Sequence, residues 1–407
     1  MAIIVQKYGG SSVADADKLK RVAQLAVECK RKGNDVVIVV SAMGKTTDSL
    51  LAQAHAISPN PDRRELDMLL SVGERISMAL LAMAIRDLGE NAISFTGSQS
   101  GIITNDRHAD ARIIEVRPYR IQDELTRGRM VIVAGYQGVS YRKEITTLGR
   151  GGSDTTAVAL AAALGAERCE IYSDVDGIFT ADPRLVPAAM KINALSHLEM
   201  QELAESGAKV LNAQAVEFAR KAGIHLYARK TGDPSQGTEV RLDAPPPSRG
   251  VRAVSHRSRV VWLTGRVATE KLFAALDEHH APAELVWLDD PEGETTAVRA
   301  VLPPENLHGL PALRAALSSA FGGAVKLEEG LGTVSLVGDG LGATHGVLRD
   351  ALKALSATSV RPVATLSTAL RLGFVLPQSD VEKAARALHR TFLEATGGQP
   401  SPHHPDR

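Results

Sequence analysis

The chain lacks most features that mark secreted, membrane-bound or nucleic-acid-binding proteins. Only two of its 407 residues are cysteines, Cys29 and Cys169, and their spacing fits neither a disulfide framework nor a metal-binding motif. Lysine plus arginine equals aspartate plus glutamate, 47 of each, so no excess charge favours nucleic acid or an anionic membrane. Neither a signal sequence nor an apolar run of membrane-spanning length is evident. We therefore expect a cytoplasmic protein with no nucleic-acid or membrane partner.

The first 242 residues have the pattern of an α/β domain with an open, mostly parallel sheet. Apolar, β-rich runs alternate with helical patterns, which is typical of a parallel sheet covered by helices on both faces. Ligands of such sheets bind at the carboxyl ends of the strands. The expected strands cover residues 3–6, 35–40, 92–95, 130–134, 169–173 and 224–228, and the expected helices cover residues 17–30, 64–88, 153–164 and 213–221.

A proline-rich segment separates this domain from a smaller C-terminal part. Three consecutive prolines occur within residues 243–250 and predict a semi-rigid linker, which we place at residues 243–257. Strand patterns at 260–264 and 334–337, each followed by a helical pattern, indicate a weak repeat of small β-α-β-β units. We place these units at residues 258–328 and 329–395, and expect a disordered tail at 396–407.

The most informative motif is the glycine-rich run LGRGGSDTTA at residues 148–157. It precedes an apolar helix, so its backbone N–H groups and the helix dipole could bind a phosphate or a carboxylate, with Arg150 as a bidentate clamp. The alternative is an ordinary strand-to-helix turn with Ser153 or Asp154 as the N-cap.

Three further segments follow the expected strands or lie close to them. Lys7 ends the first strand before the pair Gly9 and Gly10, which suits a transferring phosphoryl group. Residues 41–47 follow the second strand in the same way, and Glu74 lies in a long helix. Each feature alone could be a surface lysine or a helix ion pair. Their joint location at one sheet edge favours a functional site.

The fifth strand leads into an acidic loop, residues 173–184. Asp174, Asp176 and Asp182 could hold Mg²⁺ through oxygen ligands and a nucleotide through hydrogen bonds, or they could form a cluster of Asx turns. Two other motifs are rejected. Residues 44–46 resemble the end of a phosphate-binding P-loop but lack its first glycine, and residues 338–343 resemble a dinucleotide motif but lack the acidic residue that should follow.

Taken together, these segments resemble those of the aspartate kinases. The resemblance implies the amino acid kinase fold followed by two ACT-type regulatory units, an α+β fold of the ferredoxin type. It also implies ATP and Mg²⁺ as cofactors, L-aspartate as substrate, 4-phospho-L-aspartate as product, and a homo-oligomer. The segments that carry it are residues 7–13, 40–44, 96–101, 148–154, 173–184, 199–200 and 206–211.

The resemblance implies roles for individual residues. Lys7 and Asp174 are expected to be catalytic, and no residue is expected to bind a metal ion directly. The nucleotide is expected to contact Lys7, Tyr8, Gly9, Gly10, Ser173, Asp174, Phe179, Thr180, Ala181, Asp182, Pro183 and Arg184. Aspartate is expected to contact Ser41, Thr47, Glu74, Arg150, Gly151, Gly152, Ser153 and Asp154.

These roles are chemically consistent. The attacking carboxylate is already ionised at neutral pH, so no general base is needed and catalysis reduces to positioning and charge neutralisation. Arg150 would pair with the α-carboxylate of the substrate and Glu74 with its ammonium group. Two alternatives remain open: a kinase retuned to another amino acid or acidic metabolite, and a non-catalytic regulatory subunit. Retention of Glu74, Arg150 and Lys7 argues against both.

The regulatory half departs most from the family pattern. Residues 212–214 are Asn-Ala-Gln where the family usually has His-Pro-Arg, and Met190 replaces a usual arginine. Residues 265–269 lack the usual Asp-x-Pro-Gly turn, Trp287 could fill a small-ligand pocket, and Ala369 stands where glutamate is frequent. We therefore expect weak or altered feedback control. Separately, small β-α-β-β units expose sheet edges and an apolar helix face, so we expect a dimer or larger assembly formed through the residues after Val251.

Overall fold

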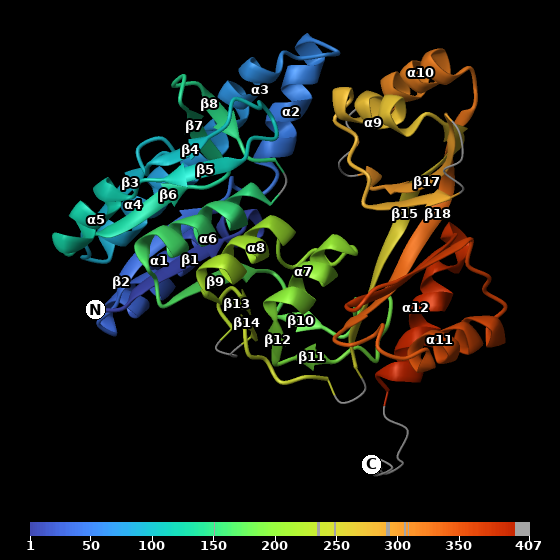
Figure 1. The fold of residues 1–407 in the computed structure, drawn as a ribbon. Helices are drawn as coiled ribbons and strands as arrows, with labels where there is room; N and C mark the ends of the chain where they lie inside the picture. Colours follow the sequence, from blue (N-terminus) through green and yellow to red (C-terminus); the bar gives the residue numbers. More distant parts are fainter. Residues whose placement is uncertain are drawn as a thin grey trace. The chain divides into compact units, whose positions relative to one another are not determined.

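The computed structural model describes residues 1–149, 151–233, 237–247, 250–289, 294–304, 307 and 309–394. These residues form two compact units that alternate along the chain (Figure 1). The N-terminal unit comprises Met1–Phe179, Lys191–Ala204 and Lys209–Pro246. The C-terminal unit comprises Thr180–Met190, Glu205–Ala208 and the chain from Pro247 onwards.

The N-terminal unit is built on an eight-stranded sheet in the order β12-β14-β13-β9-β1-β2-β6-β3. Only the β13–β14 pair is antiparallel, so the sheet is mostly parallel, as expected. The central strands are continuous apolar runs because helices cover both faces. The strands are β1 (Ile3–Tyr8), β2 (Asp35–Val40), β3 (Ala92–Phe95), β6 (Met130–Ala134), β9 (Arg168–Ser173), β12 (Ala194–Ser196), β13 (His225–Lys230) and β14 (Thr238–Arg241).

Two layers of helices cover this sheet. On one face, α1 (Ala16–Arg31) and α4 (Val72–Asp87) share a core with alternate residues of β1, β2 and β6. On the other face, α6 (Gly152–Leu164) packs against β1, β2 and β9, and also against α8 (Ala213–Ala222). Successive strand residues point to opposite faces. Tyr8 therefore lies in the α1 core, whereas Lys7 faces α6.

Smaller elements complete the unit. The sequence pattern did not predict the four-stranded sheet β5-β4-β7-β8 or the two-stranded sheet β10-β11. Their strands have only two to four residues, too few to show a period. They are β4 (Ile102–Thr104), β5 (Ile113–Val116), β7 (Gln137–Ser140), β8 (Ile145–Thr147), β10 (Ile178–Phe179) and β11 (Lys191–Ile192); the remaining helices are α2 (Thr46–Ile57), α3 (Arg63–Leu70), α5 (Tyr119–Thr126) and α7 (His197–Glu205).

The C-terminal unit contains one antiparallel sheet of six strands, in the order β16-β17-β15-β18-β20-β19. Its two long strands each serve both repeats. The first part of β15 pairs with the second part of β18, and the second part of β15 pairs with the first part of β18. The elements are β15 (Val251–Val267), α9 (Thr269–Glu278), β16 (Leu285–Asp289), β17 (Thr296–Leu302), α10 (Leu310–Phe321), β18 (Val325–Gly338), α11 (Gly346–Ala357), β19 (Ala364–Ser367), β20 (Arg371–Pro377) and α12 (Val381–Phe392).

Three expectations about local structure need correction. Residues 251–257, expected in a linker, belong to β15. The second repeat therefore includes the first part of β15, which precedes the first repeat in the sequence. The helix expected over 64–88 is divided at Ser71, whose carbonyl accepts a hydrogen bond from Gln137. Helix α6 begins at Gly152 with Gly151 as its N-cap, so neither Ser153 nor Asp154 caps it. The tail expected at 396–407 lies outside the described residues.

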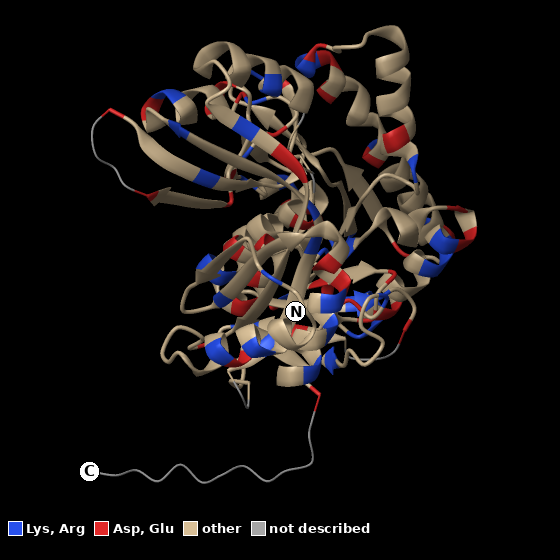
Figure 2. Cartoon of the chain, turned by 90° about the vertical axis from the view of Figure 1, so that its right-hand side faces the viewer, with Lys and Arg blue, Asp and Glu red and all other residues tan. Residues whose placement is uncertain are grey.

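One stretch of the described chain, Arg63–Asp87, is long and apolar enough to cross a membrane by length and composition. Half of its apolar window is buried inside the structure, and it contains the buried acids Asp67 and Glu74. Both features are those of a core helix in a globular domain. Figure 2 shows basic and acidic residues interspersed over both units, in keeping with the equal numbers of the two charges.

Candidate active site

A buried ion pair lies between the first strand and the glycine-rich turn. The Nζ atom of Lys7 is 2.6 Å from Oδ1 of Asp154, and each side chain is only 11% exposed. Lys7 is the penultimate residue of β1, and Asp154 lies in the first turn of α6. The pair holds a lysine ammonium group in one place beside the start of a helix, where the dipole also favours an anion.

The turns after β1 and β2 pack directly on each other at the carboxyl edge of the sheet. The amide of Gly9 donates to the carbonyl of Tyr172, and the amide of Gly44 donates to the carbonyl of Gly10. A Cβ atom on Gly10 would lie 2.7 Å from the carbonyl oxygen of Ala42, so glycine is required there. The predicted glycine pair therefore lets residues 41–44, beginning with Ser41, pack against the turn that follows Lys7, while Thr47 lies in the first turn of α2.

Glu74 is a buried carboxylate with one oxygen that accepts a hydrogen bond and one that does not. Its Oε1 accepts a hydrogen bond of 3.0 Å from the amide of Ala42, while its buried Oε2 has no hydrogen-bond partner among the described residues. Burial raises the pKa of Glu74 from 4.5 to about 7. Helix α4 can approach Ala42 this closely only because residue 73 is glycine. A Cβ atom on Gly73 would lie 2.8 Å from the Cβ atom of Ala42. The free oxygen can accept a cationic hydrogen-bond donor.

The start of α6 is a backbone-lined turn. Gly151 has φ of +72°, and a Cβ there would overlap the side chain of Asn212. Ser153 is buried, with its Oγ 2.7 Å from the position of a Cβ on Gly135 at the end of β6. No side chain caps the helix, whose dipole favours an anion at this end, while the amides of Gly152 and Asp154 donate to the carbonyls of Gly149 and Gly151. Arg150, the expected clamp, lies outside the described residues.

The residues expected to contact the nucleotide divide between the two units. Ser173 and the exposed Asp174 follow from β9, and Phe179 ends β10, all in the N-terminal unit. Residues 180–184 belong to the C-terminal unit. There Thr180 Oγ1 lies 2.9 Å from Nε2 of His389.

The other members of this run are also held in the C-terminal unit. Ala181 is part of a buried apolar core, and hydrogen bonds from Arg184 lower the pKa of the Asp182 carboxyl. Asp182 is thus engaged by a neighbouring arginine, while Asp174 is the exposed acid at the end of β9. Within the described residues there is no group of three or more His, Cys, Asp or Glu side chains that could hold a metal ion.

Sequence analysis missed two residues at the end of β13. Lys230 is exposed, and its register with Ser173 places it on the same sheet face as Lys7. Thr231 follows, with its Oγ1 2.6 Å from Oγ of Ser12 in the turn after β1. The signal was available, because both residues follow a predicted strand. Its end had been placed two residues too early.

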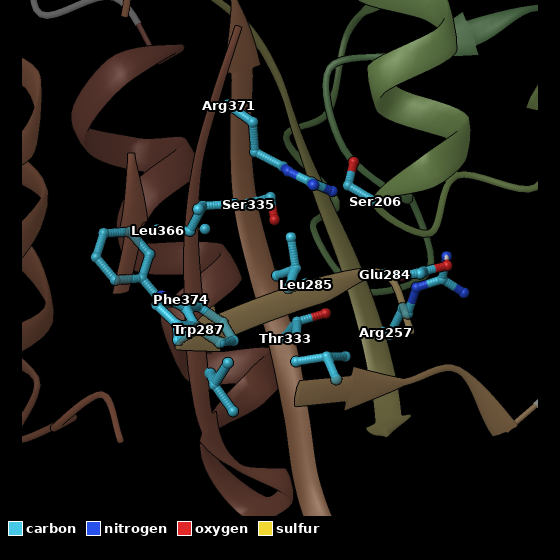
Figure 3. Close-up of a pocket in the computed structure, with 13 residues that line it drawn as sticks. Ser206, Arg257, Glu284, Leu285, Trp287, Thr333, Ser335, Leu366, Arg371 and Phe374 are labelled. Carbon is cyan, nitrogen blue, oxygen red and sulfur yellow. Dashed lines mark hydrogen bonds and ion pairs between the residues drawn. The ribbon is translucent and has the colours of Figure 1, made fainter. Parts of the chain in front are cut away.

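The C-terminal unit has a small pocket on its sheet, lined by both polar and apolar side chains (Figure 3). Trp287 lies along it and packs edge-on against Trp262, with the ring centres 5.5 Å apart. Arg257 and Glu284 form an ion pair of 2.6 Å at one side. The cavity has a volume of about 10 Å³, enough for one water molecule.

Comparisons with known proteins identify the family of the chain. Residues 2–229 match the model of the amino acid kinase family, and residues 334–392 match that of the ACT domain. The chain is 45% identical to the aspartokinase of Mycolicibacterium smegmatis and 43% identical to that of Corynebacterium glutamicum, with 96% of each chain covered. Escherichia coli aspartokinase III, solved with aspartate and ADP, superposes with a TM-score of 0.83 at 27% identity and covers 96% of this chain and 100% of its own.

The mostly parallel sheet, the fixed lysine at its edge and these matches define the class: the chain belongs to the amino acid kinase family, followed by an ACT domain. Within that family its activity is that of an aspartate kinase, an enzyme of amino-acid biosynthesis. The resemblance inferred from the motifs is thereby confirmed.

Proposed function

We propose that the chain transfers the γ-phosphoryl group of ATP to the side-chain carboxylate of L-aspartate through the site at the carboxyl edge of the N-terminal sheet. A bond forms between a carboxylate oxygen and the γ-phosphorus as the bond from that phosphorus to the β,γ-bridging oxygen breaks. The products are 4-phospho-L-aspartate and ADP. No proton has to be removed from the nucleophile, so positioning and charge neutralisation supply the catalysis.

The observation that carries this proposal is the half-satisfied carboxylate of Glu74. A buried oxygen without a partner is costly unless a ligand completes its bonding. The ammonium group of an amino acid is a donor of suitable charge, and the positive end of the α6 dipole suits one of its carboxylates. The side-chain carboxylate can then lie near Lys7.

Lys7 and Lys230 would face the phosphates from β1 and β13, and Asp154 would orient Lys7 rather than bind aspartate directly. This reassigns Asp154 from the role that the family resemblance suggests. Mg²⁺ bound to ATP would be held mainly by the phosphates and water, with the exposed Asp174 close to them, and would neutralise the charge of the transferred group.

The test is ATP-dependent formation of an acyl hydroxamate by the purified chain, across a panel of amino acids and acidic metabolites. We expect product with L-aspartate and little with substrates that lack the α-ammonium group. Phosphorylation of a different acid but not of L-aspartate would identify a retuned kinase, and no activity with any acid would identify a regulatory subunit.

We also infer weak feedback control. The pocket in Figure 3 is too small for an amino acid, and Trp287 occupies the space beside it. Escherichia coli aspartokinase III has been solved with lysine and aspartate. In this chain we expect lysine and threonine to inhibit with half-effects above about 1 mM, equivalent to roughly 4 kcal/mol of binding. Steady-state inhibition curves check this, and tighter inhibition by either amino acid would contradict it.

Self-association through the C-terminal unit is the remaining proposal about partners. The edge strand β16 exposes Val286 and Leu288, and an open groove on α11 contains the exposed Leu352. Unpaired edges and apolar helix faces favour pairing between copies. We expect a dimer or larger by light scattering at micromolar concentration, weakened by Leu288→Lys. A monomeric mass would refute the proposal. The cytoplasmic location stays a prediction.

A further inference from the structure

We propose that Asp67 is a positioning residue for the aspartate-binding turn, acting through Thr147 on the backbone that leads into α6. This inference rests on the proposed function of that turn. Asp67 belongs to α3, no substrate role has been assigned to it, and its side chain is completely buried.

The carboxylate of Asp67 gathers donors from two separate segments. Thr147 Oγ1, at the end of β8, donates to Oδ1 at 2.5 Å. His108 Nδ1 lies 2.7 Å from Oδ2, and the amide of Ala109 donates to the same carboxylate at 3.1 Å. A buried carboxylate needs such donors to offset its lost hydration. Here they join the loop at residues 105–112 to the end of β8.

From Thr147 the contacts continue to the first turn of α6. The carbonyl of Thr147 accepts from the amide of Ala111, and the carbonyl of Gly149 accepts from the amide of Gly152. Gly149 has φ of +73°, and a Cβ there would lie 3.0 Å from Oδ1 of Asp110. These contacts tie residues 147–149, and through Gly149 the first residue of α6, to the loop that Asp67 fixes. A shift at Thr147 would move the start of α6, where aspartate is proposed to bind, while leaving β9 and β13 unchanged.

The experiment compares Asp67→Asn and Thr147→Val with Thr146→Val in the full-length enzyme. Thr146 is the matched control: it also lies in β8 and makes a buried hydroxyl contact of 2.6 Å, but with Thr104. We expect Asp67→Asn and Thr147→Val to raise the KM for aspartate at least about fivefold, the effect of one lost hydrogen bond. The KM for ATP should stay within about twofold, and Thr147→Ser should restore the KM for aspartate.

Hydrogen exchange supplies a readout that does not depend on catalysis. We expect the amides of residues 148–156 to exchange faster in Thr147→Val than in Thr146→Val. If both valine variants lose the same thermal stability and the KM for aspartate and the exchange of 148–156 are unchanged, Asp67 serves stability alone and the inference is wrong. If wild-type enzyme fails to phosphorylate aspartate, the proposed function fails, and the exchange comparison still decides whether Asp67 orders the turn.

Discussion

Replacing Lys7 by alanine is expected to lower kcat by about 10²- to 10³-fold, the usual loss when one fixed charge or donor at a reacting centre is removed. The KM for aspartate should change far less, because Lys7 faces the charge that develops on the transferred phosphoryl group. Steady-state kinetics with both substrates varied measure the two effects. A large rise in the KM for aspartate at unchanged kcat would place Lys7 in substrate binding instead.

The chain supplies a matched control for this variant. Lys30 forms a comparable ion pair with Asp35, with Nζ and Oδ1 3.0 Å apart and both side chains 14% exposed. Asp35 begins β2, so this pair lies at the amino edge of the sheet, away from the proposed site. Lys30→Ala should therefore reduce thermal stability without a comparable loss of kcat.

Asp154→Asn tests whether the two residues act as a unit. If Asp154 works by orienting Lys7, the single variants and the Lys7→Ala/Asp154→Asn double variant should show similar losses in kcat. Losses that multiply would instead give Asp154 an independent role, such as direct contact with aspartate.

Glu74→Gln is expected to impair substrate binding and to stabilise the fold. The amide retains an oxygen to accept from Ala42 but loses the charge that would pair with the substrate ammonium. We expect the KM for aspartate to rise roughly 10- to 100-fold, as for loss of a hydrogen bond to a charged group. Since the wild-type carboxylate is buried with one unpartnered oxygen, its removal should raise the free energy of unfolding at pH 8 by about 1–3 kcal/mol.

The pH dependence of this effect has a definite sign. Burial raises the pKa of Glu74 from its ordinary value of 4.5 to about 7, so the folded state binds more protons than the unfolded state between these two pH values. Wild-type stability should therefore fall as pH rises from 4.5 to 7, and the advantage of Glu74→Gln should be greatest above pH 7 and vanish below pH 4.5. In the same way, kcat/KM for aspartate should fall in wild type as pH drops below about 7.

Glu124 provides the contrasting carboxylate. It is also buried, but Arg127 and Arg129 each lie within hydrogen-bond distance of it, at 2.9 and 2.7 Å. Glu124→Gln should destabilise the protein at pH 8, because it removes a charge that is already paired. Chemical unfolding of both variants at pH 5 and pH 8 measures these effects. Equal destabilisation by the two substitutions would contradict the account of Glu74.

Sequence patterns predicted the elements whose character is local. The strands at 35–40, 92–95 and 130–134 were placed at their observed bounds, because each is a buried apolar run flanked by polar residues. The break at Ser71 was missed because no proline marks it, and the bond that its carbonyl accepts comes from Gln137, which is 66 residues away. Residues 251–257 were mistaken for linker because the prolines before them suggested a boundary, whereas their pairing with β18 is a tertiary feature.

The same distinction holds for the proposed site. Lys7, Glu74 and the glycine turn could be predicted because the ends of apolar strands and glycine-rich runs are recognisable in the sequence. The partner of Lys7 could not be inferred, since Asp154 reaches it only when α6 folds back on β1. Asp67 escaped notice because in sequence it is one of several charged residues in a short helix, and its importance comes from donors 41 and 80 residues away.

The alternation of the two units along the chain also limits how the protein can be taken apart. Ala181 and Val186 precede Pro247, yet they belong to the same buried core as Val334 and Leu388. The carbonyl of Glu205 likewise binds the guanidinium of Arg257. The C-terminal unit therefore cannot be exchanged as one continuous segment. In a chimaera joined at the proline segment, residues 180–190 and 205–208 would come from one parent and the rest of the C-terminal unit from the other. Recombination between relatives should therefore succeed only when these two segments are inherited together with the C-terminal sequence.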